Sequence, residues 1–246
     1  MDQSSFWRRR VKPVVDLLAI VALITAAKVA VAEPYYVPSG SMEPTLLIGD
    51  ELIATKYPYG YSSASLPVSL VLPQTKRFFG SLPERGDVVV FRYPGDRTQV
   101  WVKRVIGLPG DVVELREGRT FINGVELPLR ADGQGTTEGV AARRFIETLP
   151  GGREHWIFKT DAANMFDNMK PVQVPADHVF VLGDNRDHSA DSRVPLAMGG
   201  VGMLPVPDLI GRVDALAGSW NPDVRDQPLW TWPAGLRLAR FFKAVR

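Results

Sequence analysis

"DVVVFRYPGDRTQVWVKRVIG", residues 87–107, decides the fold class of this chain. It contains two runs rich in β-branched and aromatic residues, at 87–93 and 98–107, and such runs are typical of β-strands. Asn123-Gly124 and Pro150-Gly151-Gly152 are hairpin signals. Further strand-like runs occur at 51–57, 111–129, 143–159, 178–184 and 211–216. The sequence therefore predicts a mostly β protein built from antiparallel sheets.

Composition excludes several classes of function. The 246 residues can bury one large core or two modest ones, and 45% hydrophobic with 23% charged residues is ordinary for a globular protein. A net charge of +2 gives no basic field for nucleic acid. The chain has no cysteine, which excludes disulfides, thiol catalysis and Cys-ligated metals. We predict no metal, no organic cofactor and no nucleic-acid partner.

An apolar segment near the N-terminus predicts one transmembrane anchor. Residues 13–32, PVVDLLAIVALITAAKVAVA, would span about 30 Å as a helix, which is the thickness of one hydrocarbon core. Its Leu, Ile and Val residues outweigh Asp16 and Lys28, which lie near the ends. Basic residues in 1–12 precede it and only Glu33 follows it, so the positive-inside rule places 1–12 in the cytoplasm.

A cleaved signal peptide is the alternative for the same segment. Its apolar core is short, and Ala30-Val31-Ala32 has the small-x-small form of a cleavage site. Cleavage there would leave a soluble protein that begins at Glu33. Both alternatives place residues 33–246 outside the cytoplasm.

The remaining chain is predicted to form one β domain with an insertion. We expect residues 33–118 and 177–246 to form that domain, and 119–176 to form a β-rich inserted subdomain. The inserted range has its own hairpin signals and a polar Gly/Thr run. The end of the chain, GLRLARFFKAVR at 235–246, has the pattern of a short basic amphipathic helix.

Three stretches are not explained by strand and turn patterns and are candidates for a functional site. They are SGSMEPTL at 39–46, WVKRVIGLPGD at 101–111 and GDNRDHSADSR at 183–193. A serine nucleophile needs a base within hydrogen-bond reach. None of the three histidines (His155, His178 and His188) lies in a familiar triad context.

Lys103 is the other candidate base. It lies among apolar residues of a predicted strand, where burial would lower its pKa. Lowering a lysine pKa from about 10.4 to about 7 costs about 4–5 kcal/mol of lost solvation, which burial can supply. A solvated lysine on the outer face of a strand is the commoner arrangement, so the residue types alone leave both readings open.

The three stretches, together with RGDVVVFRYP at 85–94, closely resemble in sequence order the conserved boxes of the bacterial type I signal peptidases. These leader peptidases are membrane-anchored serine peptidases of the Ser-Lys type. The resemblance covers about residues 34–111 and 179–213, and 112–178 match only loosely.

The resemblance implies a role for each matching residue. Ser41 would be the nucleophile and Lys103 the general base. The hydroxyl of Ser39 and the backbone N–H of Ser41 would form the oxyanion hole, and Ser189 would orient the lysine. The supporting residues would be Arg104, Asp184, Asn185, Arg186, Asp191 and Arg193. The substrate pockets would be lined by Val37, Pro38, Met42, Leu46, Trp101, Val102 and Ala190.

The function implied by the resemblance is removal of N-terminal signal peptides from exported preproteins through an acyl-enzyme. Small apolar pockets would select Ala-x-Ala sites by excluding bulk. The catalytic domain would lie on the periplasmic side of the bacterial cytoplasmic membrane, with the lipid bilayer as partner. Ser41 follows Ala32 by nine residues, at most about 30 Å of extended chain, so an anchor would hold it near the membrane face. This favours a retained anchor over a cleaved one.

Two alternative functions stay open. A specialised Ser-Lys processing peptidase of a secretion or conjugation system would have one substrate, whereas depletion of a general enzyme would make many preproteins accumulate. A catalytically silent membrane-anchored β scaffold would fail a peptide-cleavage assay. The intact surroundings of Ser41 and Lys103 argue against the scaffold.

Overall fold

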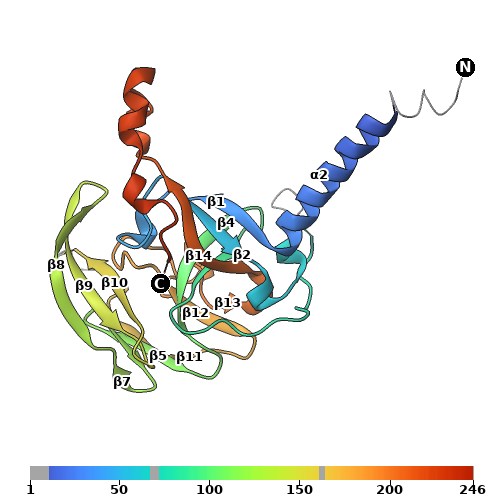
Figure 1. Ribbon diagram of the computed structural model, residues 1–246. Coiled ribbons are helices and arrows are strands. Elements are labelled where there is room, and N and C mark those ends of the chain that lie inside the picture. Colours follow the sequence, from blue (N-terminus) through green and yellow to red (C-terminus); the bar gives the residue numbers. More distant parts are fainter. Residues whose placement is uncertain (1–10, 67–71, 161–163, 246) are drawn as a thin grey trace, which may run out of the picture.

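The structure is a computed structural model that describes residues 11–66, 72–160 and 164–245, with the side chains of 25–30 left out. The basic residues Arg8, Arg9 and Arg10 of the predicted cytoplasmic segment lie outside the described residues. The body consists of antiparallel sheets (Figure 1), so the prediction of a mostly β protein is confirmed.

The largest sheet has seven strands and carries the predicted 87–107 unit at its centre. In spatial order its strands are β1 (Ala32–Tyr36), β2 (Asp50–Thr55), β14 (Leu209–Ser219), β3 (Val88–Arg92), β4 (Val100–Gly107), β12 (His178–Leu182) and β13 (Leu204–Pro205). Strand β3 pairs with β4 so that Val89 lies opposite Lys103. This register fixes which face of the sheet the lysine occupies.

Two smaller sheets contain most of residues 112–173. One has the order β10 (Glu154–Lys159), β9 (Val140–Thr148) and β8 (Leu129–Thr137). The other has the order β11 (Met169–Gln173), β5 (Val112–Arg116), β6 (Arg119–Ile122) and β7 (Val125–Glu126). Asn123 and Gly124 form the β6–β7 turn with φ of 52° and 81°, which is why this pair favours a hairpin. Strand β5 precedes the predicted insertion of 119–176, and the division into domains stays a prediction.

Packing on both faces of β3 explains why all five of its residues are buried. Val88 and Val90 belong to a core cluster with Met42 and Leu46, while Val89 belongs to a second cluster on the other face. A third cluster joins the seven-stranded sheet to the four-stranded sheet, through residues such as Ile106, Val113, Leu115 and Phe180. The first cluster matters most for function, because it supports the segment that carries Ser41.

A helix, α2 (Lys12–Ala30), forms where the anchor was predicted and projects away from the sheets (Figure 1). Within the described residues, no helix has both the length and the apolar character that crossing a bilayer requires. The other helical elements of the described ranges are 3-10 turns: η2 (Gly40–Met42), η3 (Tyr57–Tyr59), η4 (Ser63–Ser65), η5 (Leu196–Met198), η6 (Val206–Asp208), η7 (Pro222–Val224), η8 (Leu229–Gly235) and η9 (Leu238–Arg240).

The predicted C-terminal amphipathic helix is wrong. Gly235 ends the turn η8, residues 236–245 contain only the turn η9, and the chain then pairs with β14. The Leu216 N–H donates to the Lys243 carbonyl (2.9 Å), and the Val245 N–H donates to the Asp214 carbonyl (3.0 Å). Backbone pairing with the part of β14 that extends beyond its pairing with β3 therefore overrides the helical pattern of the side chains.

Candidate active site

Ser41 lies on the 3-10 turn η2, just after strand β1. The turn is fixed from below, because Met42 and Leu46 are fully buried in the core cluster. It is fixed from the side by Asn185, whose backbone N–H donates to the Ser41 carbonyl (3.2 Å) and whose side-chain amide donates to the Gly40 carbonyl (3.0 Å). The Ser41 hydroxyl is thus held at a defined place in the cleft described below.

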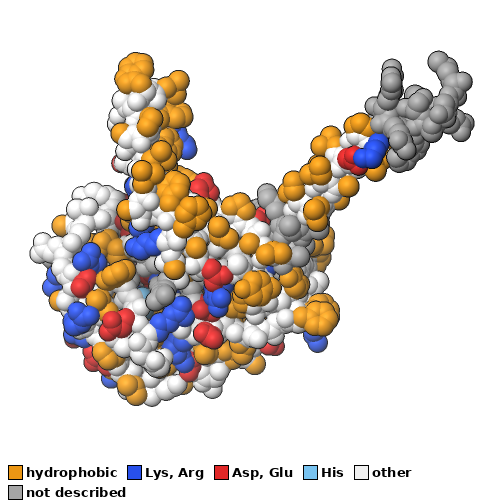
Figure 2. Space-filling model, in the orientation of Figure 1, with side chains coloured by type: hydrophobic (Ala, Val, Ile, Leu, Met, Phe, Trp, Pro, Cys, Tyr) orange, Lys and Arg blue, Asp and Glu red, His pale blue; other side chains and the backbone are white. Residues whose placement is uncertain are grey.

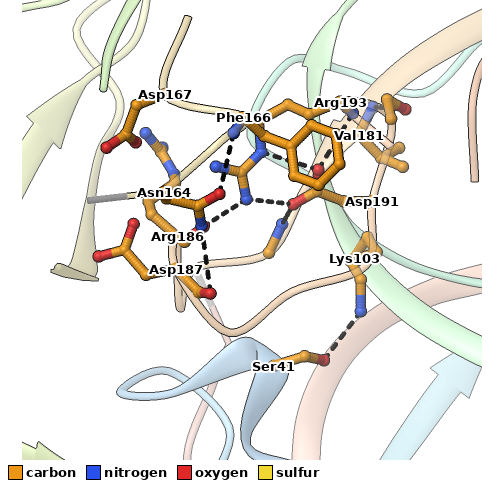
Figure 3. A network of polar contacts seen from close by, with 12 residues as sticks. Ser41, Lys103, Asn164, Phe166, Asp167, Val181, Arg186, Asp187, Asp191 and Arg193 are labelled. Carbon is orange, nitrogen blue, oxygen red and sulfur yellow. Dashed lines mark hydrogen bonds and ion pairs between the residues drawn. The ribbon is translucent and has the colours of Figure 1, made fainter. Parts of the chain in front are cut away.

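Lys103 reaches the same place from β4. Its Nζ donates hydrogen bonds to Ser41 Oγ (2.8 Å) and to the Val102 carbonyl (3.0 Å). Figure 3 shows the lysine pointing at the serine, beside a network of buried charges. Burial lowers the pKa of Lys103 to about 8, although the charges of Asp191 and Asp184 oppose that shift. The structure therefore brings Ser41 and Lys103 together and makes the lysine easier to deprotonate.

The predicted supporting residues form buried ion pairs around this contact. Arg104 binds both carboxylate oxygens of Asp184, at 2.8 and 2.7 Å. Arg193 pairs with Asp191 at 2.8 Å and also donates to the Arg186 carbonyl (Figure 3). Asp191 accepts the Gly183 N–H (3.0 Å), so these pairs hold the 183–193 loop against β4. The charges of Asp191 and Asp184 raise the pKa of Lys103, but burial outweighs them.

The two serines with predicted supporting roles, Ser39 and Ser189, differ in their contacts. Ser39 Oγ lies 3.5 Å from Ser41 Oγ, and its hydroxyl is in the cleft, where an oxyanion-hole donor would have to be. Ser189 makes no hydrogen bond to Lys103: its Oγ is buried without a partner among the described residues. That hydroxyl lies against Gly183, so close that a Cβ on the glycine would come within 2.2 Å of it. The predicted orienting contact of Ser189 is absent.

A cleft of about 570 Å³ opens beside the serine and lysine. Four of the predicted substrate-binding residues line it: Pro38, Trp101, Val102 and Ala190. The other three, Val37, Met42 and Leu46, do not line it and are buried in the core cluster. Sequence reasoning missed further lining residues, namely Tyr35, Tyr36, Leu52, Val90, Gln99, Val100 and Glu138, and His188 of the 183–193 stretch also lines the cleft. Those on β1 and β4 adjoin the motifs, whereas nothing local pointed to Glu138.

The arrangement is suited to nucleophilic catalysis. A serine hydroxyl and an amine of lowered pKa in contact can form the nucleophile and general base of an acyl transfer. The buried imidazole of His155 is poorly placed to act as the base for Ser41, because it lies outside the cleft. Burial also keeps its pKa well below the ordinary value. His178 likewise is not a cleft residue, and His188, which lines the cleft, faces Glu138 with 3.8 Å between Nδ1 and Oε2. Ser41 and Lys103 are therefore the candidates for the chemistry of this site.

Comparisons with known proteins identify a family and relatives of this chain. The family model described as "Signal peptidase, peptidase S26" matches residues 10–217. Signal peptidase I of Rickettsia typhi is 36% identical over 241 residues, covering 91% of this chain and 89% of the relative. That of Rickettsia akari is 36% identical over 235 residues, covering 92% and 86%.

A solved structure is also similar in sequence. The crystal structure of a signal peptidase I from Enterococcus faecalis V583 is 26% identical, covers 54% of this chain and 97% of its own, and superposes with a TM-score of 0.34. The assignment rests on the family match over most of the chain and on the relatives of similar length. This chain belongs to the signal peptidase family, peptidase S26.

Proposed function

We propose that this protein is a serine endopeptidase that removes signal peptides from exported preproteins. The observation that carries the proposal is the 2.8 Å contact between Lys103 Nζ and Ser41 Oγ, in the cleft of a signal peptidase family member. Neither a binding module nor a scaffold requires a buried amine of lowered pKa against a serine hydroxyl.

Neutral Lys103 takes the proton of Ser41 Oγ as the oxygen attacks the scissile carbonyl carbon. The Ser39 hydroxyl and the Ser41 backbone N–H donate to the oxyanion that develops, and each such donor is worth about 10²–10³ in rate. The protonated lysine then gives its proton to the leaving amine, and the C–N bond breaks to leave an acyl-serine. Lys103 next takes a proton from water, which attacks the ester carbonyl carbon. The lysine then returns that proton to Ser41 Oγ as the ester C–O bond breaks, which releases the signal peptide and restores the free serine and the neutral lysine.

We further propose that the cleft selects Ala-x-Ala sites. Its walls next to the serine are the apolar side chains of Pro38, Trp101 and Val102. Trp101 is stacked on Tyr93 with ring centroids 4.1 Å apart, which makes that wall rigid. Apolar walls of this kind exclude bulky side chains by steric clash.

Membrane attachment through α2 is part of the proposal. The described apolar side chains of this helix are exposed, with Leu17 61% and Leu23 71% accessible. Trp230 and Phe242 of the C-terminal part are similarly exposed, at 81% and 80%. Figure 2 shows hydrophobic side chains covering both α2 and the second projection, which is red in Figure 1, and both extend from the same side of the view. Lipid would cover these surfaces and keep the cleft at the membrane face.

The direct test is cleavage of a model preprotein by the full chain in detergent. We expect mass spectrometry to show one new N-terminus, directly after an Ala-x-Ala site. Ser41→Ala and Lys103→Ala should give no product while retaining the circular dichroism of the wild type. Cleavage by Ser41→Ala would contradict the proposal. Depletion in the source bacterium then separates a general role, with many preproteins accumulating, from a specialised one.

A further inference from the structure

Glu138 is the only acidic side chain among the described residues that line the cleft. It lies at the tip of the β8–β9 hairpin, where its φ of 47° marks the tight turn. Its Oε1 accepts the Gly40 N–H (3.3 Å), next to Ser41 in the chain. His188 faces it, with Nδ1 3.8 Å from Glu138 Oε2. A carboxylate from a distant hairpin thus reaches the nucleophile turn.

Buried hydrogen bonds fix the tip of the β8–β9 hairpin in this position. Asn185 donates from one side-chain amide to both the Thr137 hydroxyl (2.7 Å) and the Gly40 carbonyl (3.0 Å). Thr137 and Asn185 are both buried. Because Thr137 directly precedes Glu138, the same contacts that hold the serine turn also place the carboxylate at the cleft.

The two ends of the cleft differ in chemistry. Strands β1 and β4 both run toward the Ser41–Lys103 contact, and the end from which they start is apolar and neutral, lined by residues such as Tyr35, Leu52, Val90 and Val100. Glu138 contacts Gly40, next to Ser41, and His188 faces Glu138, so both line the cleft at the serine turn. The small apolar residues of a signal peptide match the end from which the strands start. A peptide bound in this way brings the residues that follow the scissile bond to Glu138 and His188.

We infer that Glu138, with His188 beside it, forms a charge-selective subsite for the residues just after the scissile bond. It favours substrates whose mature N-terminus carries a basic side chain and disfavours acidic ones. The inference rests on the proposed function. Glu138 is half-exposed, so solvent screens its charge, and a single opposite or like charge should change kcat/KM by about two- to fivefold.

The test uses the full chain in detergent and peptides that share one Ala-x-Ala sequence. The peptides differ only in having Lys, Gln or Glu at the first, second or third residue after the bond. For the wild type we expect kcat/KM to fall in the order Lys, Gln, Glu at one or more of these positions. The Lys-to-Glu ratio should approach one in Glu138→Gln, reverse in Glu138→Lys and shrink between 0.1 and 1 M salt, because the Debye length falls from about 10 to about 3 Å.

The matched control is Glu126→Gln. Glu126 has the same side-chain exposure as Glu138, 46%, but lies on β7 and pairs with Arg119. Its ratio should equal that of the wild type. An unchanged ratio in both Glu138 variants would overturn the subsite and leave the peptidase proposal standing. Failure of the wild type to cleave any peptide, or cleavage by Ser41→Ala, would instead overturn the peptidase proposal.

Discussion

At the scale of single residues, the state of Lys103 decides activity. Burial lowers its pKa to about 8, so below that pH the amine is mostly protonated and cannot accept the serine proton. We expect kcat/KM for preprotein cleavage to rise with pH through about 8 and to stay high above it. Lys103→Arg should be as inactive as Lys103→Ala, because a guanidinium stays protonated in proteins.

The control for this pH series is His178→Ala, which changes a histidine outside the cleft. It should retain the wild-type rate and pH profile. Substantial cleavage by Lys103→Arg would contradict the role of Lys103 as base. A pH profile that changes when a histidine is replaced would contradict it as well.

The same shift of pKa predicts a cost in stability. A lysine whose folded-state pKa lies near 8, below its ordinary 10.5, opposes folding fully below pH 8. The penalty is relieved between about pH 8 and 10.5, where the unfolded chain binds the proton and the folded chain does not. We therefore expect the unfolding free energy of the wild type to increase relative to that of Lys103→Met as pH rises through this window. The difference between the two should change by up to about 3 kcal/mol. Urea unfolding at pH 7, 8.5 and 10 measures it, and a constant difference would contradict it.

The residues that were predicted correctly and those that were not differ in what decides their position. Ser41 and Lys103 sit in long motifs, and the structure brings them into contact. Met42 lies in the same motif, yet whether its side chain points into the cleft or the core depends on packing against strands far away in sequence. Glu138 reaches the cleft only through the hairpin pairing of β8 with β9. The catalytic roles themselves stay predictions.

At the scale of elements, the strands with β-branched runs were the predictable part of the fold. The runs at 87–93 and 98–107 correspond to β3 and β4, which pair directly. Strand β8 was not predictable from its own residues, because LRADGQGTT is polar and contains two glycines. It is a strand because it pairs with β9 along its length, so tertiary pairing overrides local propensity.

An element-scale prediction concerns the ion pair that joins β4 to the loop after β12. Arg104 and Asp184 are both fully buried, so removing one partner leaves an uncompensated charge. We expect Asp184→Ala to lower the unfolding free energy by about 3–5 kcal/mol. The exposed pair of Arg119 and Glu126 is the comparison, and Glu126→Ala should cost less than about 1 kcal/mol. Equal losses in urea titrations of the two variants would show that the buried pair does not hold the loop.

At the scale of the whole molecule, the site depends on how the body is joined to α2. Strand β1 follows that helix and leads within a few residues to Ser41. Glu33 at this junction pairs with the fully buried Lys56 (3.0 Å), which also donates to the Ser65 carbonyl (2.7 Å). The junction is therefore part of the folded domain, and whatever holds α2 also sets the direction in which the cleft faces.

The last prediction follows from that junction. If α2 is a retained anchor, mass spectrometry of protein extracted from membranes should find residues 1–32 still attached, and protease added from outside should reach the remainder of the chain. Ala30-Val31-Ala32 nevertheless resembles the proposed substrate, and the Val31 side chain is 54% exposed. Slow self-cleavage in detergent should thus release a species beginning at Glu33, and Ser41→Ala should be spared. A soluble species beginning at Glu33 as the main form in cells would rule out the anchor, because retention is what keeps Ser41 near the membrane face.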